Sequence, residues 1–171
     1  MREVTSIRLR TLLWFTCVVV PFIGLLPWWL YRQIEPPFVW EGRPGQWLGA
    51  WLILNGIGLG GWCVSLFNVE GRGTPLPLDP PKQFVASGPY RFVRNPMVLG
   101  LFLILAGETL LYQSLVVAGY FLLAVILIML FVRFVEEPEL ERRFGPPYAS
   151  YKRQVPRWIP RPGLGGPRQR G

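Results

Sequence analysis

Four apolar segments separated by polar stretches dominate the sequence. They run from about Leu9 to Tyr31, from Trp47 to Phe67, from Met97 to Tyr112 and from Ser114 to Val135. A membrane crossing needs about 20 apolar residues, with about 17 as a practical minimum, so these segments predict four transmembrane helices, the third being the shortest. Because only Tyr112 and Gln113 lie between the last two segments, we expect those two helices to form a tight antiparallel hairpin.

The composition favours a membrane protein as well. The 171 residues are 51% hydrophobic and only 16% charged, and the mean hydropathy is +0.31. Soluble domains carry about 25% charged residues, so this chain lacks the polar surface to cover a water-facing globule. We expect one all-α membrane-embedded domain over residues 1–160, followed by a disordered tail over residues 161–171, which are rich in Pro, Gly and Arg.

The positive charges indicate an orientation in the membrane. The net charge of +8 could suggest nucleic-acid binding, but Lys and Arg cluster between and after the apolar segments. Three precede the first segment, two lie in the loop 32–46, four in the loop 68–96 and eight follow the fourth segment. The positive-inside rule then places both termini and the loop 68–96 in the cytoplasm. We expect an integral protein of the cell (inner) membrane of a prokaryote, without a nucleic-acid partner.

Several kinds of chemistry are excluded by residues that are missing. The chain has no histidine, which removes the usual zinc ligand, the usual general base and any Ser-His-Asp triad. Cys17 and Cys63 lie in apolar runs without CxxC spacing, so we expect two buried thiols and no metal site. The second segment spells GxGxxG at Gly56, Gly58 and Gly61. No strand precedes it, so close helix packing is favoured over dinucleotide binding.

Two polar regions share the predicted cytoplasmic side, namely the loop 68–96 and the segment 133–160. Both mix charged, aromatic and turn-forming residues, which is the composition of a built site. The alternative is an interfacial collar of Arg and Tyr that only anchors the protein. Within the second region, short helices from Pro138 to Phe144 and from Tyr148 to Gln154 are predicted. Folded back over the loop 82–97, they would form a lid that excludes water.

Ordered motifs within these regions carry a family resemblance. They are the stretch from Ser87 to Met97 (SGPYRFVRNPM), Glu136-Glu137-Pro138, Phe144-Gly145, Tyr148, Tyr151 and Val155-Pro156. Their order across residues 72–160 resembles the integral-membrane methyltransferases related to isoprenylcysteine carboxyl methyltransferase and to phosphatidylethanolamine N-methyltransferase. The family's usual Arg-His-Pro is Arg94-Asn95-Pro96 here, and Asn-Pro-Met is closer to the phospholipid branch. Asn95 can donate an amide N–H but cannot titrate near neutral pH.

The resemblance implies an S-adenosylmethionine-dependent enzyme. Its cofactor pocket would lie at the cytoplasmic membrane face and be completed by C-terminal helices over about residues 136–155. The implied cofactor contacts are Lys82, Gln83, Phe84, Val85, Tyr90, Asn95, Pro96, Met97, Val98, Glu136 and Glu137. The family's substrate-side arginine corresponds to Arg133, so Arg133 and Glu137 are the implied catalytic residues.

The chemistry of S-adenosylmethionine adds three side chains to this set. Arg94 or Lys82 suits the carboxylate of the cofactor, as Glu137 suits its ammonium group. Tyr90, Tyr148 and Tyr151 offer aromatic faces for the adenine or for the cation. For Tyr148 and Tyr151, anchoring at the membrane interface is the alternative interpretation.

Methyl transfer to a lipid or a lipophilic small molecule, either an amine or a carboxylate, is the predicted function. The reaction is an in-line displacement that requires mainly proximity and alignment, so the missing histidine is no obstacle. A membrane reductase of related fold that uses NADPH and a non-catalytic membrane scaffold are the alternatives. Glu108, within the third segment, is a functional candidate, but a position near the outer end of the span, snorkelling or paired with Asn55, is favoured.

Overall fold

The structure is a computed structural model that describes residues 15–34, 43–71 and 83–160. Lys82, the predicted disordered tail 161–171 and the beginning of the first predicted span lie outside the described residues. The described elements are all helical, of which η1 and η3 are π-helical and η2 is a 3-10 turn. They are η1 (Phe15–Leu25), α2 (Leu26–Gln33), α3 (Arg43–Val69), η2 (Gly88–Arg91), α4 (Pro96–Tyr112), α5 (Leu115–Phe131), η3 (Val132–Glu136), α6 (Glu137–Phe144) and α7 (Pro146–Gln154).

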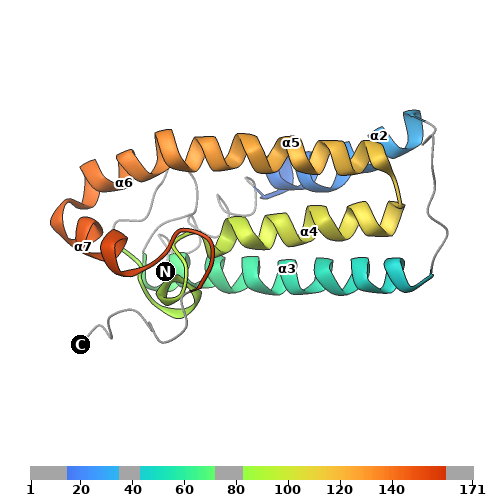
Figure 1. Cartoon of the computed structure of the whole chain (residues 1–171). Coiled ribbons are helices and arrows are strands. Elements are labelled where there is room, and N and C mark those ends of the chain that lie inside the picture. Colours follow the sequence, from blue (N-terminus) through green and yellow to red (C-terminus); the bar gives the residue numbers. More distant parts are fainter. Residues whose placement is uncertain (1–14, 35–42, 72–82, 161–171) are drawn as a thin grey trace.

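The long helices lie side by side. Figure 1 shows α3, α4 and α5 running along the length of the molecule, with α4 between the other two and contacting both. The helix that begins with α5 continues through η3 into α6 and extends past the start of α4, and α7 turns back at that end. The first predicted span appears as η1 and α2, which contact α4 and α5 respectively. Pro21 lies inside η1, and Pro27 is the second residue of α2, next to the change from π-helical to α-helical geometry.

Glycines hold α3 and α4 at close range. A Cβ atom added to Gly56 would lie 2.5 Å from the carbonyl oxygen of Gly100, and one added to Gly49 would lie 2.6 Å from that of Gly107. The two contacts are seven residues apart on each helix, in opposite chain directions, as expected for an antiparallel pair. Any side chain at these positions would push the backbones apart, because backbone atoms cannot move aside as a flexible side chain can.

The packing role predicted for the glycines of the second segment is confirmed at Gly56 and at Gly60, whose backbone N would lie 3.3 Å from a Cβ atom added to Gly100, while no contact within the described chain supports it at Gly58 and Gly61. A Cβ atom added at either of the latter would meet nothing within 4 Å. The expectation of two buried thiols is also half right, because Cys63 is buried while Cys17 is exposed. Only one face of each helix can contact a neighbour, and the apolar character of the sequence does not say which face that is.

The predicted hairpin between the last two apolar segments is confirmed. Gln113 follows α4 in the left-handed region, with a φ of 51°, which reverses the chain in a single residue. Ser114 then caps α5, and its hydroxyl oxygen accepts a hydrogen bond from the Val117 N–H at 3.4 Å.

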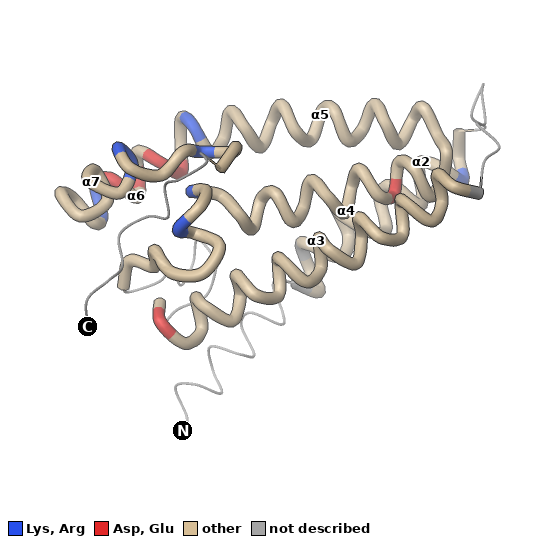
Figure 2. Tube along the Cα trace, turned by 60° about the horizontal axis from the view of Figure 1, so that its bottom comes forward, with Lys and Arg blue, Asp and Glu red and all other residues tan. Residues whose placement is uncertain are grey.

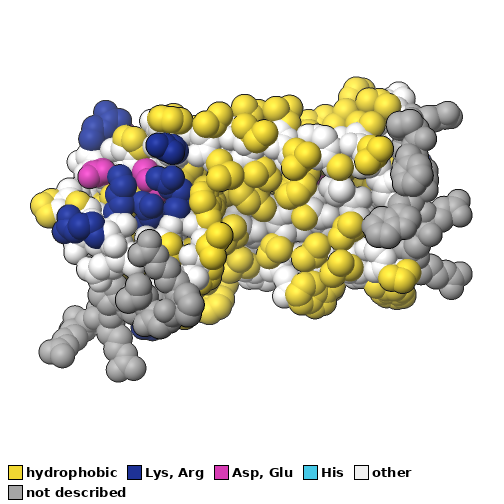
Figure 3. Space-filling view, viewed as in Figure 1, with side chains coloured by type: hydrophobic (Ala, Val, Ile, Leu, Met, Phe, Trp, Pro, Cys, Tyr) yellow, Lys and Arg dark blue, Asp and Glu magenta, His cyan; other side chains and the backbone are white. Residues whose placement is uncertain are grey.

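Two helices of the described chain are long and apolar enough to cross a membrane, Pro44–Val69 and Leu115–Phe144, while Pro96–Tyr112 is a shorter apolar helix. Hydrophobic side chains cover the outside of the helices (Figure 3), among them Trp47, which is 77% exposed. A 30-residue helix such as Leu115–Phe144 is about 45 Å long, more than the roughly 30 Å of bilayer hydrocarbon. Its apolar stretch is followed by polar last turns, from Glu136 onward.

Charged residues gather at one end of the molecule. In Figures 2 and 3, Lys, Arg, Asp and Glu concentrate around α6, α7 and the turn that precedes α4. The two short C-terminal helices match the prediction with one shift. Helix α6 ends before Gly145, which has a φ of 59°, but α7 already begins at Pro146. A proline suits the first turn of a helix, since the N–H it lacks has no partner there.

Glu108 lies in the second half of α4, away from the charged end of the molecule, and is 7% exposed. Its Oε2 atom has no hydrogen-bond partner among the described residues. The suggested pairing with Asn55 is wrong, because the Asn55 side chain is exposed and donates to the carbonyl oxygen of Trp51 on its own helix at 2.8 Å. Asn55 precedes Gly56 by one position, about 100° around the helix, and so lies away from the line of contact with α4.

Candidate functional site

The loop that enters α4 is fixed against α3. Val85 and Tyr90 are buried together with Cys63 of α3, and Met97 packs against this cluster. The Tyr90 ring meets Phe67 edge-on, with the ring centroids 5.5 Å apart. Burial raises the pKa of the Tyr90 hydroxyl well above its usual value, so Tyr90 stays in its neutral form.

A second cluster joins the same loop to the C-terminal helices. Phe84 meets Tyr148 and Tyr151 edge-on, with ring centroids 5.7 Å and 4.9 Å away. The Tyr151 hydroxyl donates a hydrogen bond to the carbonyl oxygen of Tyr90 at 2.7 Å. Tyr148 and Tyr151 are 2% and 5% exposed, so both rings pack inside the protein and not on its surface.

The backbone after α7 is hydrogen-bonded to the residues that begin α4. The Arg94 N–H donates to the carbonyl oxygen of Pro156 at 2.9 Å, and Asn95 Nδ2 lies 3.5 Å from the carbonyl oxygen of Arg157. The predicted folding of the C-terminal helices onto the loop 82–97 is therefore confirmed for the described residues. Their role as a lid over a cofactor stays a prediction.

Glu137 is the centre of the charged residues. Its side chain is 3% exposed and takes a two-pronged hydrogen bond from Arg157, with Nε 2.7 Å from Oε1 and Nη2 2.8 Å from Oε2. Arg94 Nη1 lies 2.9 Å from Oε1, and Lys152 Nζ lies 3.9 Å from Oε2. One buried carboxylate thus faces three cations that come from the turn before α4, from α7 and from the segment after α7.

These charges set the ionisation of the acidic pair. Burial alone would raise the pKa of the Glu137 carboxyl, but the hydrogen bond from Arg157 and the charges of Arg94, Arg157 and Lys152 lower it below the usual value. For Glu136, burial and the charge of Glu137 raise the pKa. The pKa values of the two adjacent carboxyl groups therefore differ, and Glu137 carries a negative charge over the wider pH range.

Several buried donors in this region have no hydrogen-bond partner in the described chain. They are Nε and Nη1 of Arg94 and Nε of Arg91; the short distance from Arg94 Nη1 to Glu137 is an ion pair without hydrogen-bond alignment. Buried donors cost free energy unless an acceptor meets them. A bound carboxylate would satisfy them, and Glu137 next to them can take an ammonium group.

Most of the predicted site residues belong to the two clusters or to the charged residues around Glu137. The aromatic cluster holds Phe84, Tyr148 and Tyr151, the α3 side holds Val85, Tyr90 and Met97, and the charged centre holds Arg94, Glu136 and Glu137. Asn95 and Pro96 are buried at the start of α4, followed by the half-buried Val98. Gln83 is exposed, and its backbone N–H donates to the Gly71 carbonyl oxygen at 3.2 Å.

Arg133 is separate from this group in the structure. Its side chain is exposed, and its guanidinium carbon lies 5.5 Å from the ring centroid of Phe134. The structure gives Arg133 no contact with Glu137. Its catalytic role, implied by the resemblance, stays a prediction.

Sequence reasoning missed Arg157, the residue that contacts Glu137 most closely. The only signal was its position directly after the Val155-Pro156 motif. It also missed Lys152, whose Nζ lies 2.9 Å from Oε2 of Glu141 as well as near Glu137. Both depend on how the chain turns after α6, which no local pattern gives.

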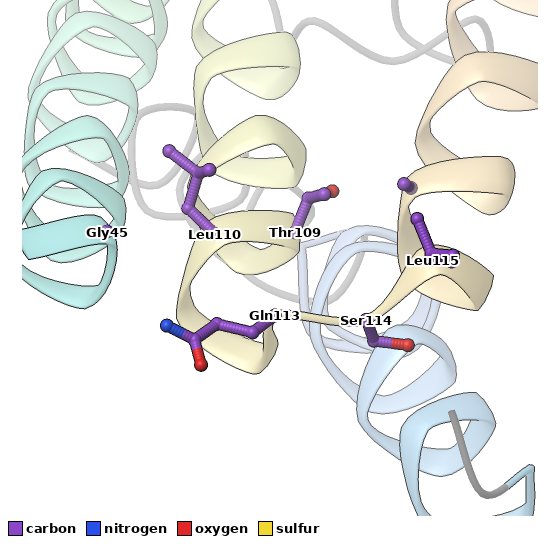
Figure 4. A pocket seen from close by; sticks show the side chains of 7 residues that line it. Gly45, Thr109, Leu110, Gln113, Ser114 and Leu115 are labelled. Carbon is purple, nitrogen blue, oxygen red and sulfur yellow. The ribbon is translucent and has the colours of Figure 1, made fainter. Parts of the chain in front are cut away.

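A cavity of about 180 Å³ lies at the other end of the molecule (Figure 4). It is lined by Gly45, Thr109, Leu110, Gln113, Ser114, Leu115 and Ala118. None of the predicted site residues borders it, and the 17-residue helix α4, about 25 Å long, separates it from the charged centre. We assign it no part in the site.

Comparison with known proteins identifies the family. The family model for phospholipid methyltransferases matches residues 45–147, more than half of the chain. The chain belongs to the phospholipid methyltransferase family. The matched range of this family member contains α3, the turn before α4, α4, α5 and α6, and thus Arg94 and Glu137. Tyr148, Tyr151 and Arg157 follow its end.

A curated relative agrees with this assignment. Methanethiol S-methyltransferase 2 of Bradyrhizobium diazoefficiens is 29% identical over 158 residues, covering 81% of this chain and 56% of the relative. The family member described here therefore spans little more than half the length of that relative. No solved structure matches the chain. Neither match favours the reductase or the scaffold alternative.

Proposed function

We propose that the chain is an S-adenosylmethionine-dependent methyltransferase that acts on a lipid or a lipophilic small molecule. The observation that carries this proposal is the buried Glu137 carboxylate beside Arg94, whose Nε and Nη1 donors make no hydrogen bond within the described chain, in a chain that belongs to a methyltransferase family. A carboxylate and an arginine at one buried place match a ligand with both an ammonium and a carboxylate group. The methionine part of the proposed cofactor carries both.

The residues of the charged centre and of the aromatic cluster fit such a cofactor. Arg94 would hold its carboxylate through Nε, which has no hydrogen-bond partner among the described residues, and through Nη1, which lies 2.9 Å from Glu137 Oε1 without forming an aligned hydrogen bond. Glu137 would accept its ammonium group, and Tyr148 and Tyr151 would offer aromatic faces to the adenine or the sulfonium. When bound, S-adenosylmethionine supplies a methyl group on a positively charged sulfur, ready for displacement by a nucleophile.

The chain's own contribution is to position the reactants and exclude water. Aligning two reactants lowers the barrier of a displacement without any acid or base. Phe84, Tyr148 and Tyr151 form an apolar cluster, which would protect a reactive cation bound beside it from water. For an amine acceptor, a carboxylate or a water molecule would take the proton before attack.

The proposed arrangement in the membrane is four spans with both termini and the C-terminal helices in the cytoplasm. It is supported by the four apolar segments and by the charged residues at one end (Figure 2). A location in the cell (inner) membrane of a prokaryote fits the bacterial source of the relative. The acceptor would enter from the bilayer between helices, since the outer faces of α3 and α5 are apolar.

The acceptor atom is part of the test. Amine and carboxylate acceptors follow from the family resemblance, and the name of the relative adds a thiol. The purified chain in vesicles would receive S-adenosylmethionine labelled on the methyl group, together with phosphatidylethanolamine, a long-chain carboxylic acid or a long-chain thiol. We expect label in one acceptor from the wild-type chain and strong loss of transfer in Glu137→Gln, with Arg142→Gln as the exposed control. Absence of transfer to all three acceptors by the folded protein would argue against the proposal.

A further inference from the structure

Arg157, which follows the C-terminal helices, forms two hydrogen bonds to the Glu137 carboxylate. Resting on the proposed function, we propose that Arg157 is a positioning residue of the cofactor site. It fixes the Glu137 carboxylate so that one acceptor position on Oε2 stays open to a ligand's ammonium group. Nothing in the family match covers Arg157, which lies ten residues beyond its end at residue 147.

The acceptor positions of Glu137 can be counted. A carboxylate offers about four lone pairs, two on each oxygen. Arg157 uses one on each, through Nε to Oε1 at 2.7 Å and Nη2 to Oε2 at 2.8 Å. Arg94 Nη1 lies against Oε1 at 2.9 Å, whereas the only further cation near Oε2 in the described chain is Lys152 at 3.9 Å, beyond hydrogen-bond distance. Among the described residues, Oε2 therefore accepts one hydrogen bond, from Arg157, and its second acceptor position is faced by Lys152 at 3.9 Å.

The fork of Arg157 also fixes the plane of the carboxylate. Two parallel N–H···O bonds hold both oxygens at once, which a lysine with its single ammonium cannot do. Glu137 has torsional freedom that would otherwise be lost on binding a ligand, and a site held in its binding geometry in advance avoids that cost. Arg157 is therefore expected to act through Glu137 and not by touching the ligand.

The backbone that carries Arg157 is anchored independently of its side chain. The carbonyl oxygen of Pro156 accepts from the Arg94 N–H at 2.9 Å, and the Val155 N–H donates to Tyr151 at 2.9 Å. The Trp158 ring lies 5.8 Å from that of Phe102 in α4. Because these contacts do not involve the guanidinium, substitutions of Arg157 should leave the C-terminal helices in place.

A competing interpretation makes the opposite prediction. If Arg157 merely occupied the place of the ligand's ammonium group, its removal would free Glu137 and tighten binding. If it positions Glu137, its removal weakens binding. The sign of the change therefore separates the two.

The experiment is a calorimetric titration of S-adenosylmethionine into the full chain in detergent, repeated across about pH 4 to pH 8. The variants are wild type, Arg157→Lys, Arg157→Gln and, as a control with the same loss of charge, Arg142→Gln, whose partner Glu139 is exposed. We expect Arg157→Gln to bind at least about tenfold more weakly at neutral pH, Arg157→Lys to lie between, and Arg142→Gln to match wild type.

The pH profile is a readout that a purely structural role would not change. The ligand's ammonium group binds ionised Glu137, so binding is lost as the pH falls through the pKa of that carboxyl. Without the hydrogen bond from Arg157, burial raises this pKa, and binding should be lost at a higher pH. The other charged or titratable groups around Glu137 in the described chain are Arg94, Lys152, Arg157, Glu136 and Tyr148. Of these types only a carboxyl titrates in the measured window, so Glu136 alone could be confused with Glu137.

A titration of the ligand-free protein resolves the two acids. Glutamates labelled with ¹³C at the side-chain carboxyl give separate NMR signals, and the Glu137 signal is assigned by its loss in Glu137→Gln. We expect this signal to titrate at higher pH in Arg157→Gln than in wild type, and near the wild-type pH in Arg157→Lys. If the wild type binds, tighter or unchanged binding in Arg157→Gln overturns the proposal. If the wild type does not bind while the NMR shift appears, the proposed function has failed and the role toward a cofactor fails with it, but the pairing of Arg157 with Glu137 stands.

Discussion

Substituting Glu137 by glutamine is the perturbation whose effect the structure predicts in most detail. The change keeps the shape of the side chain and removes its charge. It leaves Arg94, Arg157 and Lys152 without the carboxylate that they share. The three cations would then repel one another at the end of the molecule where the C-terminal helices meet the loop.

The size of the effect follows from burial. Removing one partner of a buried ion pair costs about 3–5 kcal/mol. Glu137 and Arg94 are 3% and 10% exposed, but Arg157 and Lys152 keep 28% and 35% exposure and can be partly rehydrated. We therefore expect the lower end, about 3 kcal/mol. For a chain of this length, that corresponds to a midpoint of thermal unfolding lower by about 6–12 °C.

The matched control is Glu141→Gln. Glu141 lies one helical turn further along α6 and pairs with Lys152 at 2.9 Å, but both side chains are substantially exposed. Such pairs contribute about 0–1 kcal/mol. Thermal unfolding in detergent, followed by tryptophan fluorescence, should show a clear loss for Glu137→Gln and little change for Glu141→Gln.

The pH dependence supplies a second check on the same variant. A carboxyl whose pKa is lowered in the folded state stabilises the fold above its unfolded value of 4.5 and loses that contribution as the pH falls through the folded value. The difference in unfolding midpoint between wild type and Glu137→Gln should therefore shrink below about pH 4.5. Equal losses for Glu137→Gln and Glu141→Gln at neutral pH would refute the reasoning.

Three further predictions concern the helices and the C-terminal segment. Gly56→Ala should destabilise the protein by about 2 kcal/mol or more, because its Cβ would lie 2.5 Å from the Gly100 carbonyl oxygen. Gly58→Ala, whose Cβ would have no atom within 4 Å, should be neutral or stabilising. Similar midpoints of thermal unfolding for the two variants would contradict the close contact. Glu108→Leu should raise the unfolding temperature, because it removes a buried carboxyl with an unpartnered oxygen, and a loss of methyl transfer in the folded variant would instead assign Glu108 a function. Truncation after Gly145 should weaken S-adenosylmethionine binding at least about tenfold without unfolding the long helices, as measured by calorimetry and circular dichroism; unchanged affinity would exclude the lid.

Local signals in the sequence were sufficient for the existence of the helices and for some of their ends. Apolar runs and helix-stopping residues act within a few positions, so the hairpin at Gln113 and the end of α6 at Gly145 could be read directly. The number of membrane crossings is a different matter. The prediction that residues 9–31 and the short α4 cross the membrane is based on composition alone. In the described chain, only Pro44–Val69 and Leu115–Phe144 have both the length and the apolar character that a membrane crossing needs.

Tertiary contacts could be predicted only where a motif encoded them. The resemblance placed Glu137 and Arg94 in one site although they are more than forty residues apart, and the structure brings them to 2.9 Å. Arg157 carried no such motif, and its contact depends on a turn after α7 that is fixed by distant backbone bonds. The predicted pairing of Asn55 with Glu108 was wrong for a different reason. A polar residue in an apolar helix suggests a partner on a neighbouring helix, but the Asn55 side chain donates to the Trp51 carbonyl oxygen of its own helix.

The measurement that tests the central claim most directly is calorimetric binding of S-adenosylmethionine to the purified wild-type chain in detergent, with Glu137→Gln beside it. The proposed function predicts saturable binding by the wild type, displacement by S-adenosylhomocysteine, and a loss of at least about tenfold in affinity for Glu137→Gln. Absence of binding to the folded wild-type protein at millimolar cofactor, or equal binding by Glu137→Gln, would contradict it.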